Sequence, residues 1–99
     1  MEQVRLDASG WICPGDFYDA LLPRLGAPDW HGRNLDALRD SIRGGINRLE
    51  PPFEVIVSAA WSQSAEMRQF LMQVERLFKD TCDEGAGDVA IRFQPSLTP

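Results

Sequence analysis

The sequence predicts an α/β fold: a small three-stranded parallel sheet with helices packed on it. Three segments have strand character, at residues 2–7, 53–57 and 88–93, and the segments between them have helical periodicity. Strands separated by helices are joined by right-handed crossovers, which favour a parallel sheet. The 99 residues, 43% of them hydrophobic, suit one domain with one core. We expect this domain at residues 1–94 and a frayed tail at 95–99.

The first strand and the first helix follow from local patterns. Residues 2–7 alternate between polar and apolar side chains, as in a half-buried strand. A helix should begin at about Pro14 and end at Gly26, and Pro23 should kink or shorten it. Its apolar face consists of residues at helical spacing: Phe17, Ala20, Leu21 and Leu25.

A second helix is expected from about Asn34, which is a good N-cap, to Gly44 and Gly45. Its apolar stripe has helical spacing: Leu35, Leu38, Ile42 and Ile46. Asp36 and Asp40 lie four residues apart and therefore share another face. Like charges at this spacing cost an isolated helix on the order of a few tenths of a kcal/mol, so we expect cations to compensate them.

The second half of the chain is expected to form two strands around one long helix. The β-branched and apolar residues 53–57 favour a buried central strand. Residues 58–63 have no clear pattern. A helix should begin near Ser64 and end at 84–87, with apolar residues at helical spacing: Phe70, Leu71, Val74, Leu77 and Phe78.

Composition excludes several function classes. The net charge of −5 argues against nonspecific binding of nucleic acid, which needs basic patches, and favours a basic partner. The sequence has no long apolar run and no signal peptide, so we expect a cytoplasmic protein without a membrane partner. Cys13 and Cys82 lack metal-ligand or redox spacing, and we interpret them as buried free thiols. We expect no metal, no cofactor and no enzymatic activity, because no nucleophile, base and orienting group occur together.

The segment from Ala27 to Asp40 has an ordinary structural interpretation. Asp36 would lie in the first helical turn, where the helix dipole favours an anion, and Asp40 could pair with Arg43. Trp30 could simply fill a gap in the packing, and His31 is expected to be an exposed loop residue. In this interpretation the aspartates form only a solvated helix face.

The same segment resembles the barstar family of intracellular ribonuclease inhibitors. The likeness is carried by Pro28, Trp30, Gly32, the run Asn34-Leu35-Asp36-Ala37-Leu38, Asp40 and Gly44. Weaker similarity covers most of the chain. The resemblance implies a three-stranded parallel sheet with packed helices, and a protein that blocks the active site of a ribonuclease with its second helix and the preceding loop.

The resemblance also implies roles for individual residues. Trp30 would pack on the enzyme, Asp36 and Asp40 would face its phosphate-binding cations, and Gly44 would allow close backbone approach. Asp80 would add a peripheral ion pair. Carboxylates on a rigid helix can stand in for a phosphate, because a ribonuclease site is dense in cationic donors.

This sequence departs from the family pattern in its charges. Arg39 and Gly45 stand where the family's best-known member has tryptophans, and residues 29–43 hold three acids and three arginines. We expect Arg39 to pair with Asp36 and, together with Arg43, to contact the partner. As a hypothesis, the partner presents acidic residues to these arginines and so differs from a barnase-like enzyme.

Two functions therefore remain open. In the first, the protein is an inhibitor or immunity protein that is a monomer when free and binds a ribonuclease or nuclease toxin. Alternatively, it is a non-inhibitory adaptor that binds another protein through a barstar-like scaffold.

Overall fold

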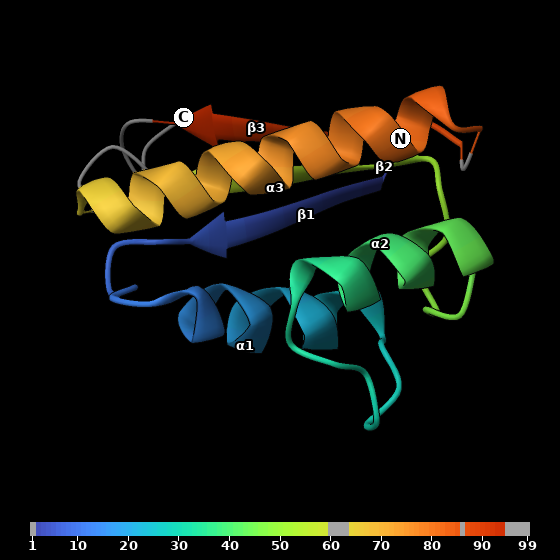
Figure 1. Ribbon diagram of the computed structural model, residues 1–99, viewed down its shortest axis with the longest axis horizontal. Coiled ribbons are helices and arrows are strands. Elements are labelled where there is room, and N and C mark those ends of the chain that lie inside the picture. Colours follow the sequence, from blue (N-terminus) through green and yellow to red (C-terminus); the bar gives the residue numbers. More distant parts are fainter. Residues whose placement is uncertain (1, 60–63, 86, 95–99) are drawn as a thin grey trace.

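The computed structural model describes residues 2–59, 64–85 and 87–94, and its elements follow one another as the sequence predicts (Figure 1). They are β1 (Glu2–Asp7), α1 (Pro14–Leu25), α2 (Leu35–Gly44), β2 (Phe53–Ser58), α3 (Ala65–Asp83) and β3 (Val89–Gln94). The strands form one parallel sheet in the order β1-β2-β3, which confirms the predicted α/β fold. The expected tail at 95–99 and residues 60–63 of the unassigned segment lie outside the described residues.

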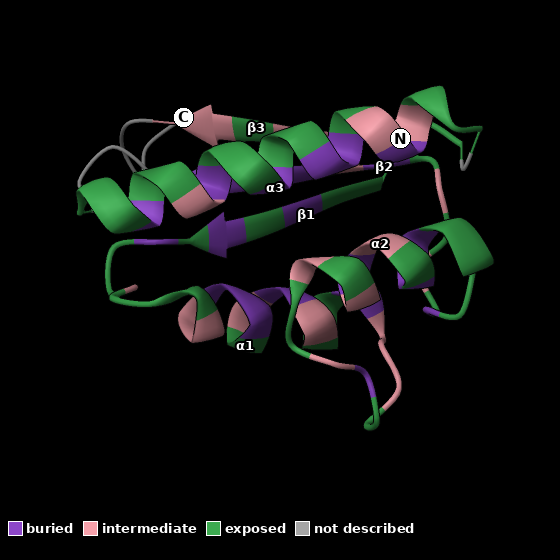
Figure 2. Ribbon diagram, in the orientation of Figure 1, coloured by how far each residue is buried: buried purple, intermediate pink, exposed green. Residues whose placement is uncertain are grey.

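The core lies between one face of the sheet and the helices. Both connections run in the same direction across the sheet, and right-handed crossovers then place the helices on a single face. The strand residues on that face belong to one buried cluster with side chains of all the helices: Val4 and Leu6 in β1, Phe53, Val55 and Val57 in β2, and Val89 in β3. Figure 2 shows buried segments along the strands and on the helix sides that face them.

One of the two effects predicted for Pro23, a shorter α1, does not occur, and the helix ends at Gly26 as predicted. The helix continues through Pro23 to Leu25, so the proline does not shorten it. The reason is position: in the last turn a proline removes one hydrogen bond, while Leu21 and Leu25 on either side of it are fully buried and hold the turn in place.

At the N-terminal end of α1, the Asp16 carboxylate accepts hydrogen bonds from the N–H groups of Ile12 (2.7 Å) and Cys13 (3.3 Å). The Ile12 bond above all lowers the pKa of Asp16.

The prediction for the cysteines is half right. Both thiols are free, but Cys13 is exposed and Cys82 is only half-buried. Cys13 precedes the first turn of α1, and Cys82, near the end of α3, has its sulfur 4.0 Å from the carboxylate of Asp88, which directly precedes β3. Cys13 therefore lies outside the core, and Cys82 packs against its edge.

The segment after α2 packs back on the end of α1 and so fixes the position of α2. Gly26 caps α1 in a left-handed conformation with φ 66°, and a Cβ there would come within 2.6 Å of the Arg48 side chain. The N–H of Arg48 donates to the Gly26 carbonyl (3.3 Å), and the N–H of Leu49 donates to the Leu25 carbonyl (3.0 Å). These contacts connect both ends of the loop–helix unit at residues 26–49 to α1.

Candidate functional site

Helix α2 is delimited by capping groups at both ends. The Asn34 side chain accepts a hydrogen bond from the Ala37 N–H (2.8 Å), which confirms its predicted place as the N-cap. At the other end, Gly45 has a left-handed conformation (φ 66°), and its N–H donates to the Ser41 carbonyl. The helix therefore begins and ends at defined residues.

The inner side of α2 packs into the core. Leu38 is fully buried and Ile42 is 3% exposed, as the apolar stripe predicts. Between them, the Ser41 hydroxyl donates to the Leu38 carbonyl (2.9 Å) and accepts from the Asn47 side-chain amide (3.1 Å). The prediction for Ile46 is wrong: it follows the end of the helix, where the backbone leaves the helical path, and is 43% exposed.

Asp36 and Asp40 lie on the outer side of α2, and both are exposed. The ion pairs found in the described part of the chain include neither carboxylate. Asp36 lies in the first turn, where the helix dipole favours a negative charge. The two carboxylates are therefore presented to solvent by a helix that the core holds in place.

The arginines of the same segment are paired with acidic residues elsewhere in the fold. Arg33 forms an ion pair with Asp19 of α1. Arg39 and Arg43 both contact Glu84 at the end of α3, with N–O distances of 2.6 and 3.5 Å. The Glu84 hydrogen bond and charge raise the pKa of the Arg39 guanidinium above its usual value. All three arginines of residues 29–43 are thus paired outside the segment, and its three aspartates, Asp29, Asp36 and Asp40, have no ion-pair partner among the described residues.

Two predicted contacts are absent from the described structure. Arg39 bonds Glu84 and not Asp36, although Asp36 is close enough to act on its charge. Arg43 likewise pairs with Glu84 and not with Asp40. Helical spacing predicts only contacts within α2, and the α2–α3 packing supplies a better placed carboxylate.

Glu84 is the residue that sequence reasoning missed. It caps the C-terminus of α3 and lies 45 positions from Arg39 in the chain. No local pattern connects the two positions, and the contact arises only because α2 packs beside α3. The sequence signal that could have pointed to Glu84 is the presence of acidic residues at the predicted end of the long helix.

Trp30 lies in the loop before α2 and is 75% exposed, so it does not fill a gap in the packing. A tryptophan exposed to this extent, in the loop that precedes the helix with the two carboxylates, is a feature of protein interfaces, where aromatic anchors are enriched. Its neighbour His31 contradicts the prediction of an exposed residue, because it is only 7% exposed. The loop turns through a hydrogen bond from the His31 N–H to the Pro28 carbonyl (3.0 Å), and the His31 Nδ1 donates to the Gly32 carbonyl (2.6 Å).

Gly44 lies in the last turn of α2 and is exposed. A Cβ at this position would meet only the Ile46 side chain, at 3.9 Å, which is an ordinary contact. In contrast, a Cβ on Gly32 would come within 3.1 Å of the Ala37 side chain. The fold therefore requires glycine at position 32 far more than at position 44.

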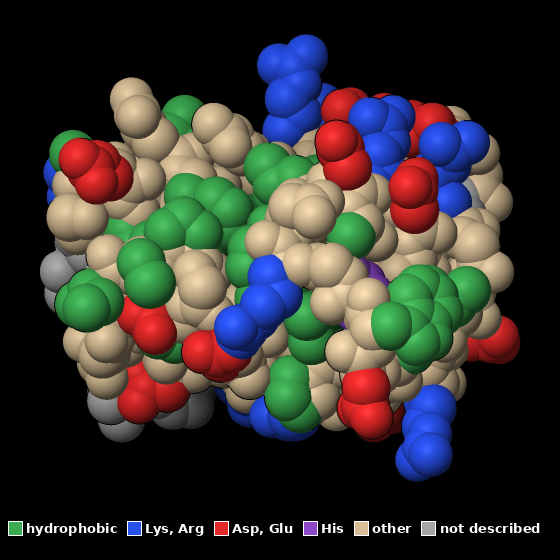
Figure 3. Space-filling model, turned by 60° about the horizontal axis from the view of Figure 1, so that its bottom comes forward, with side chains coloured by type: hydrophobic (Ala, Val, Ile, Leu, Met, Phe, Trp, Pro, Cys, Tyr) green, Lys and Arg blue, Asp and Glu red, His purple; other side chains and the backbone are tan. Residues whose placement is uncertain are grey.

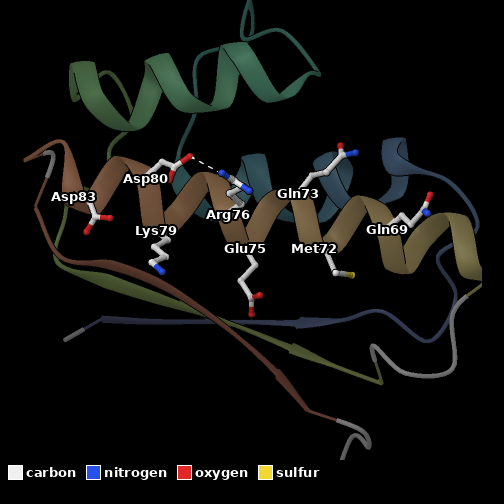
Figure 4. A pocket seen from close by; sticks show the side chains of 8 residues that line it. All are labelled: Gln69, Met72, Gln73, Glu75, Arg76, Lys79, Asp80 and Asp83. Carbon is white, nitrogen blue, oxygen red and sulfur yellow. Dashed lines mark ion pairs between the residues drawn. The ribbon is translucent and has the colours of Figure 1, made fainter.

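Asp80 lies on α3 and not on α2 or the preceding loop like the other predicted site residues, but its charge acts on Arg39 of α2. It is half-exposed and forms a long ion pair with Arg76 (4.0 Å). Figure 4 shows both side chains on the upper flank of α3, the side of α2 in this view, while Glu75 and Lys79 extend from the lower flank. The residues drawn in Figure 4 line a shallow hollow, and all of them belong to α3, so this hollow is an open helix surface.

The face formed by α1 and α2 has a mixed charge pattern. Figure 3 shows acidic and basic side chains interspersed at its upper right, with hydrophobic side chains in separate patches.

Within residues 2–59, 64–85 and 87–94, no helix is long and apolar enough to span a bilayer. The same residues contain no group of three or more His, Cys, Asp or Glu side chains suited to hold a metal ion.

Comparison with known proteins identifies the family. The family model Barstar, described as "Barstar (barnase inhibitor)", matches residues 1–94. No curated protein matches the chain. Since the match covers nearly the whole chain and agrees with the observed sheet and helix order, this protein belongs to the barstar family.

Proposed function

We propose that this protein inhibits a ribonuclease, such as a nuclease toxin, by inserting α2 and the preceding loop into its active site. The observation that carries the proposal is the pair of exposed carboxylates, Asp36 and Asp40, on a helix whose neighbouring arginines are paired elsewhere. A ribonuclease site stabilises negative charge on a phosphodiester with cationic donors. A carboxylate held in a fixed position can occupy the same donors.

The remaining site residues suit the edge of such an interface. Trp30 offers a large exposed ring beside α2, and Gly44 leaves the backbone of its last turn accessible. Asp80 is available on α3 for a peripheral ion pair, which speeds association more than it adds affinity. The net charge of −5 favours encounter with a basic enzyme. The barstar family is described by inhibition, which supports an inhibitor over an enzyme.

The proposal is tested by capture followed by an activity assay. The wild-type domain and an Asp40→Ala variant serve as baits in a lysate of the source organism, and each retained protein is assayed for RNA cleavage. We expect the wild type alone to retain a ribonuclease, whose activity returns when the complex is dissociated. A retained protein without ribonuclease activity would instead identify an adaptor on a barstar-like scaffold.

Gly44→Ala separates the needs of the fold from those of the interface. In the free protein the substitution is expected to be neutral or to stabilise by about 0.5 kcal/mol, since alanine is the better helix former. In the complex an added methyl group at a close backbone contact costs about 1–2 kcal/mol, or roughly tenfold in affinity. Thermal unfolding and the inhibition constant measure the two effects.

Gly15→Ala is the matched control, because Gly15 is also helical and a Cβ there meets the Cys13 sulfur at 3.6 Å, an ordinary contact. It should leave inhibition unchanged. Equal inhibition by the Gly44→Ala variant and wild type would remove Gly44 from the interface.

A further inference from the structure

Glu84 holds two arginines of α2 with one carboxylate. One oxygen lies 2.6 Å from the Arg39 guanidinium, and the other lies 3.5 Å from that of Arg43. The two arginines are four residues apart and therefore lie on the same side of α2, one turn apart. The Glu84 side chain is 30% exposed, so solvent screens these pairs less than those of a fully exposed residue.

We propose that Glu84 is a positioning residue that keeps the binding face of α2 acidic by serving as the internal counter-ion of Arg39 and Arg43. The inference rests on the proposed function and deepens it. Glu84 acts through the two arginines, and it is their side chains that it holds away from Asp36 and Asp40.

The alternative partners of the arginines lie on α2 itself. Arg39 is three residues from Asp36, and Arg43 is three residues from Asp40, a spacing at which opposite charges on a helix attract. Without Glu84, each guanidinium would turn towards its neighbouring aspartate and neutralise it. The carboxylates would then meet a cationic active site already paired, and an enzyme cation would have to displace an arginine.

The environment of Arg39 supports a fixed side chain. Its Nε is buried without a hydrogen-bond partner among the described residues, so the guanidinium lies against the protein surface. Besides Glu84, the charges of Asp80 and Asp36 act on it. Glu84 and Asp80, at and near the end of α3, thus attract Arg39 towards that helix.

This arrangement also identifies the chemistry of the partner. With Arg39 and Arg43 drawn to Glu84, whose single negative charge offsets part of theirs, Asp36 and Asp40 are the charges of α2 that have no ion-pair partner among the described residues. A cationic site satisfies them, and the partner needs no acidic residues of its own. The charge-swapped contact hypothesised from the sequence would instead need these arginines to be free for the partner.

A simple structural link between α2 and α3 is the competing explanation, and rescue distinguishes the two. Four proteins are compared for ribonuclease inhibition and association rate at low salt: wild type, Glu84→Gln, Arg39→Gln with Arg43→Gln, and the triple variant. We expect Glu84→Gln to weaken inhibition about tenfold or more, mostly through slower association. The triple variant should recover to within about threefold of wild type, since the freed arginines cause the loss.

Asp83→Asn is the matched control, because it removes the same charge from the adjacent residue of α3 and leaves the arginine pairs intact. The proposal is overturned if Glu84→Gln inhibits as well as Asp83→Asn, or if the triple variant stays as weak as Glu84→Gln. The second result would show that the α2–α3 link itself is what matters.

A crystal structure of the free Glu84→Gln variant decides the question without any enzyme. We expect the Arg39 or Arg43 guanidinium within hydrogen-bond distance of the Asp36 or Asp40 carboxylate. Guanidinium groups that stay beside residue 84 would overturn the proposal. A wild-type protein that inhibits no ribonuclease would contradict the proposed function alone, while this structure still tests the role of Glu84.

Discussion

Asp40→Asn is expected to weaken the complex with the target ribonuclease at least about 100-fold while the free protein stays as stable as the wild type. In the complex, the substitution would leave enzyme cations buried without a counter-charge, which costs about 3–5 kcal/mol, and each 1.4 kcal/mol is tenfold in affinity. In the free protein Asp40 is exposed and belongs to none of the ion pairs of the described residues. Surface changes of this kind stay within about 0.5 kcal/mol.

The inhibition constant and the free energy of unfolding in urea are the two measurements. Asp36→Asn should follow the same trend with a smaller loss of affinity. The charge control is again Asp83→Asn, which removes the same single negative charge from α3 instead of α2. A similar loss for Asp83→Asn would mean that overall charge, and not the position of Asp40, governs binding.

Leu38→Ala is expected to destabilise the free protein by about 3 kcal/mol, because it leaves a cavity beneath α2. Leu38 is fully buried, and α2 has few other buried side chains to hold it on the core. For a domain of this size each kcal/mol corresponds to about 4–8 °C in Tm, so the melting temperature should fall by more than about 10 °C. Calorimetry measures the change directly.

Ile46→Ala is the natural comparison, since Ile46 is also aliphatic and follows α2 but is 43% exposed. Its loss should stay below about 1 kcal/mol. If Leu38→Ala cost no more than Ile46→Ala, α2 would not be anchored through its apolar stripe, and the rigid presentation of Asp36 and Asp40 would lose its basis.

The fold followed from the sequence because its elements have strong periodicity. Alternation in residues 2–7 and helical spacing around Val74 each match one structure only, and the chain order then determines a parallel sheet. Pro23 did not shorten α1 because burial of Leu25 outweighs one missing hydrogen bond. The predicted burial of Ile46 was wrong because Gly45 ends α2, so the apolar stripe does not continue to residue 46.

The site was predictable where it depends on one helix and not where it depends on two. The outward face with Asp36 and Asp40 follows from spacing relative to Leu38. The partners of Arg39 and Arg43 do not, because Glu84 reaches them only through tertiary packing. The burial of His31 could not be predicted either, because it depends on the turn in which the His31 N–H bonds the Pro28 carbonyl.

The central claim is that the α2 carboxylates occupy the phosphate-binding site of a ribonuclease, and competition with a mononucleotide tests it most directly. The captured enzyme is titrated with wild-type protein at several concentrations of a 3′-mononucleotide. The account predicts that the apparent inhibition constant rises in proportion to nucleotide concentration, because both ligands need the same cations. An inhibition constant that does not change with nucleotide would contradict it.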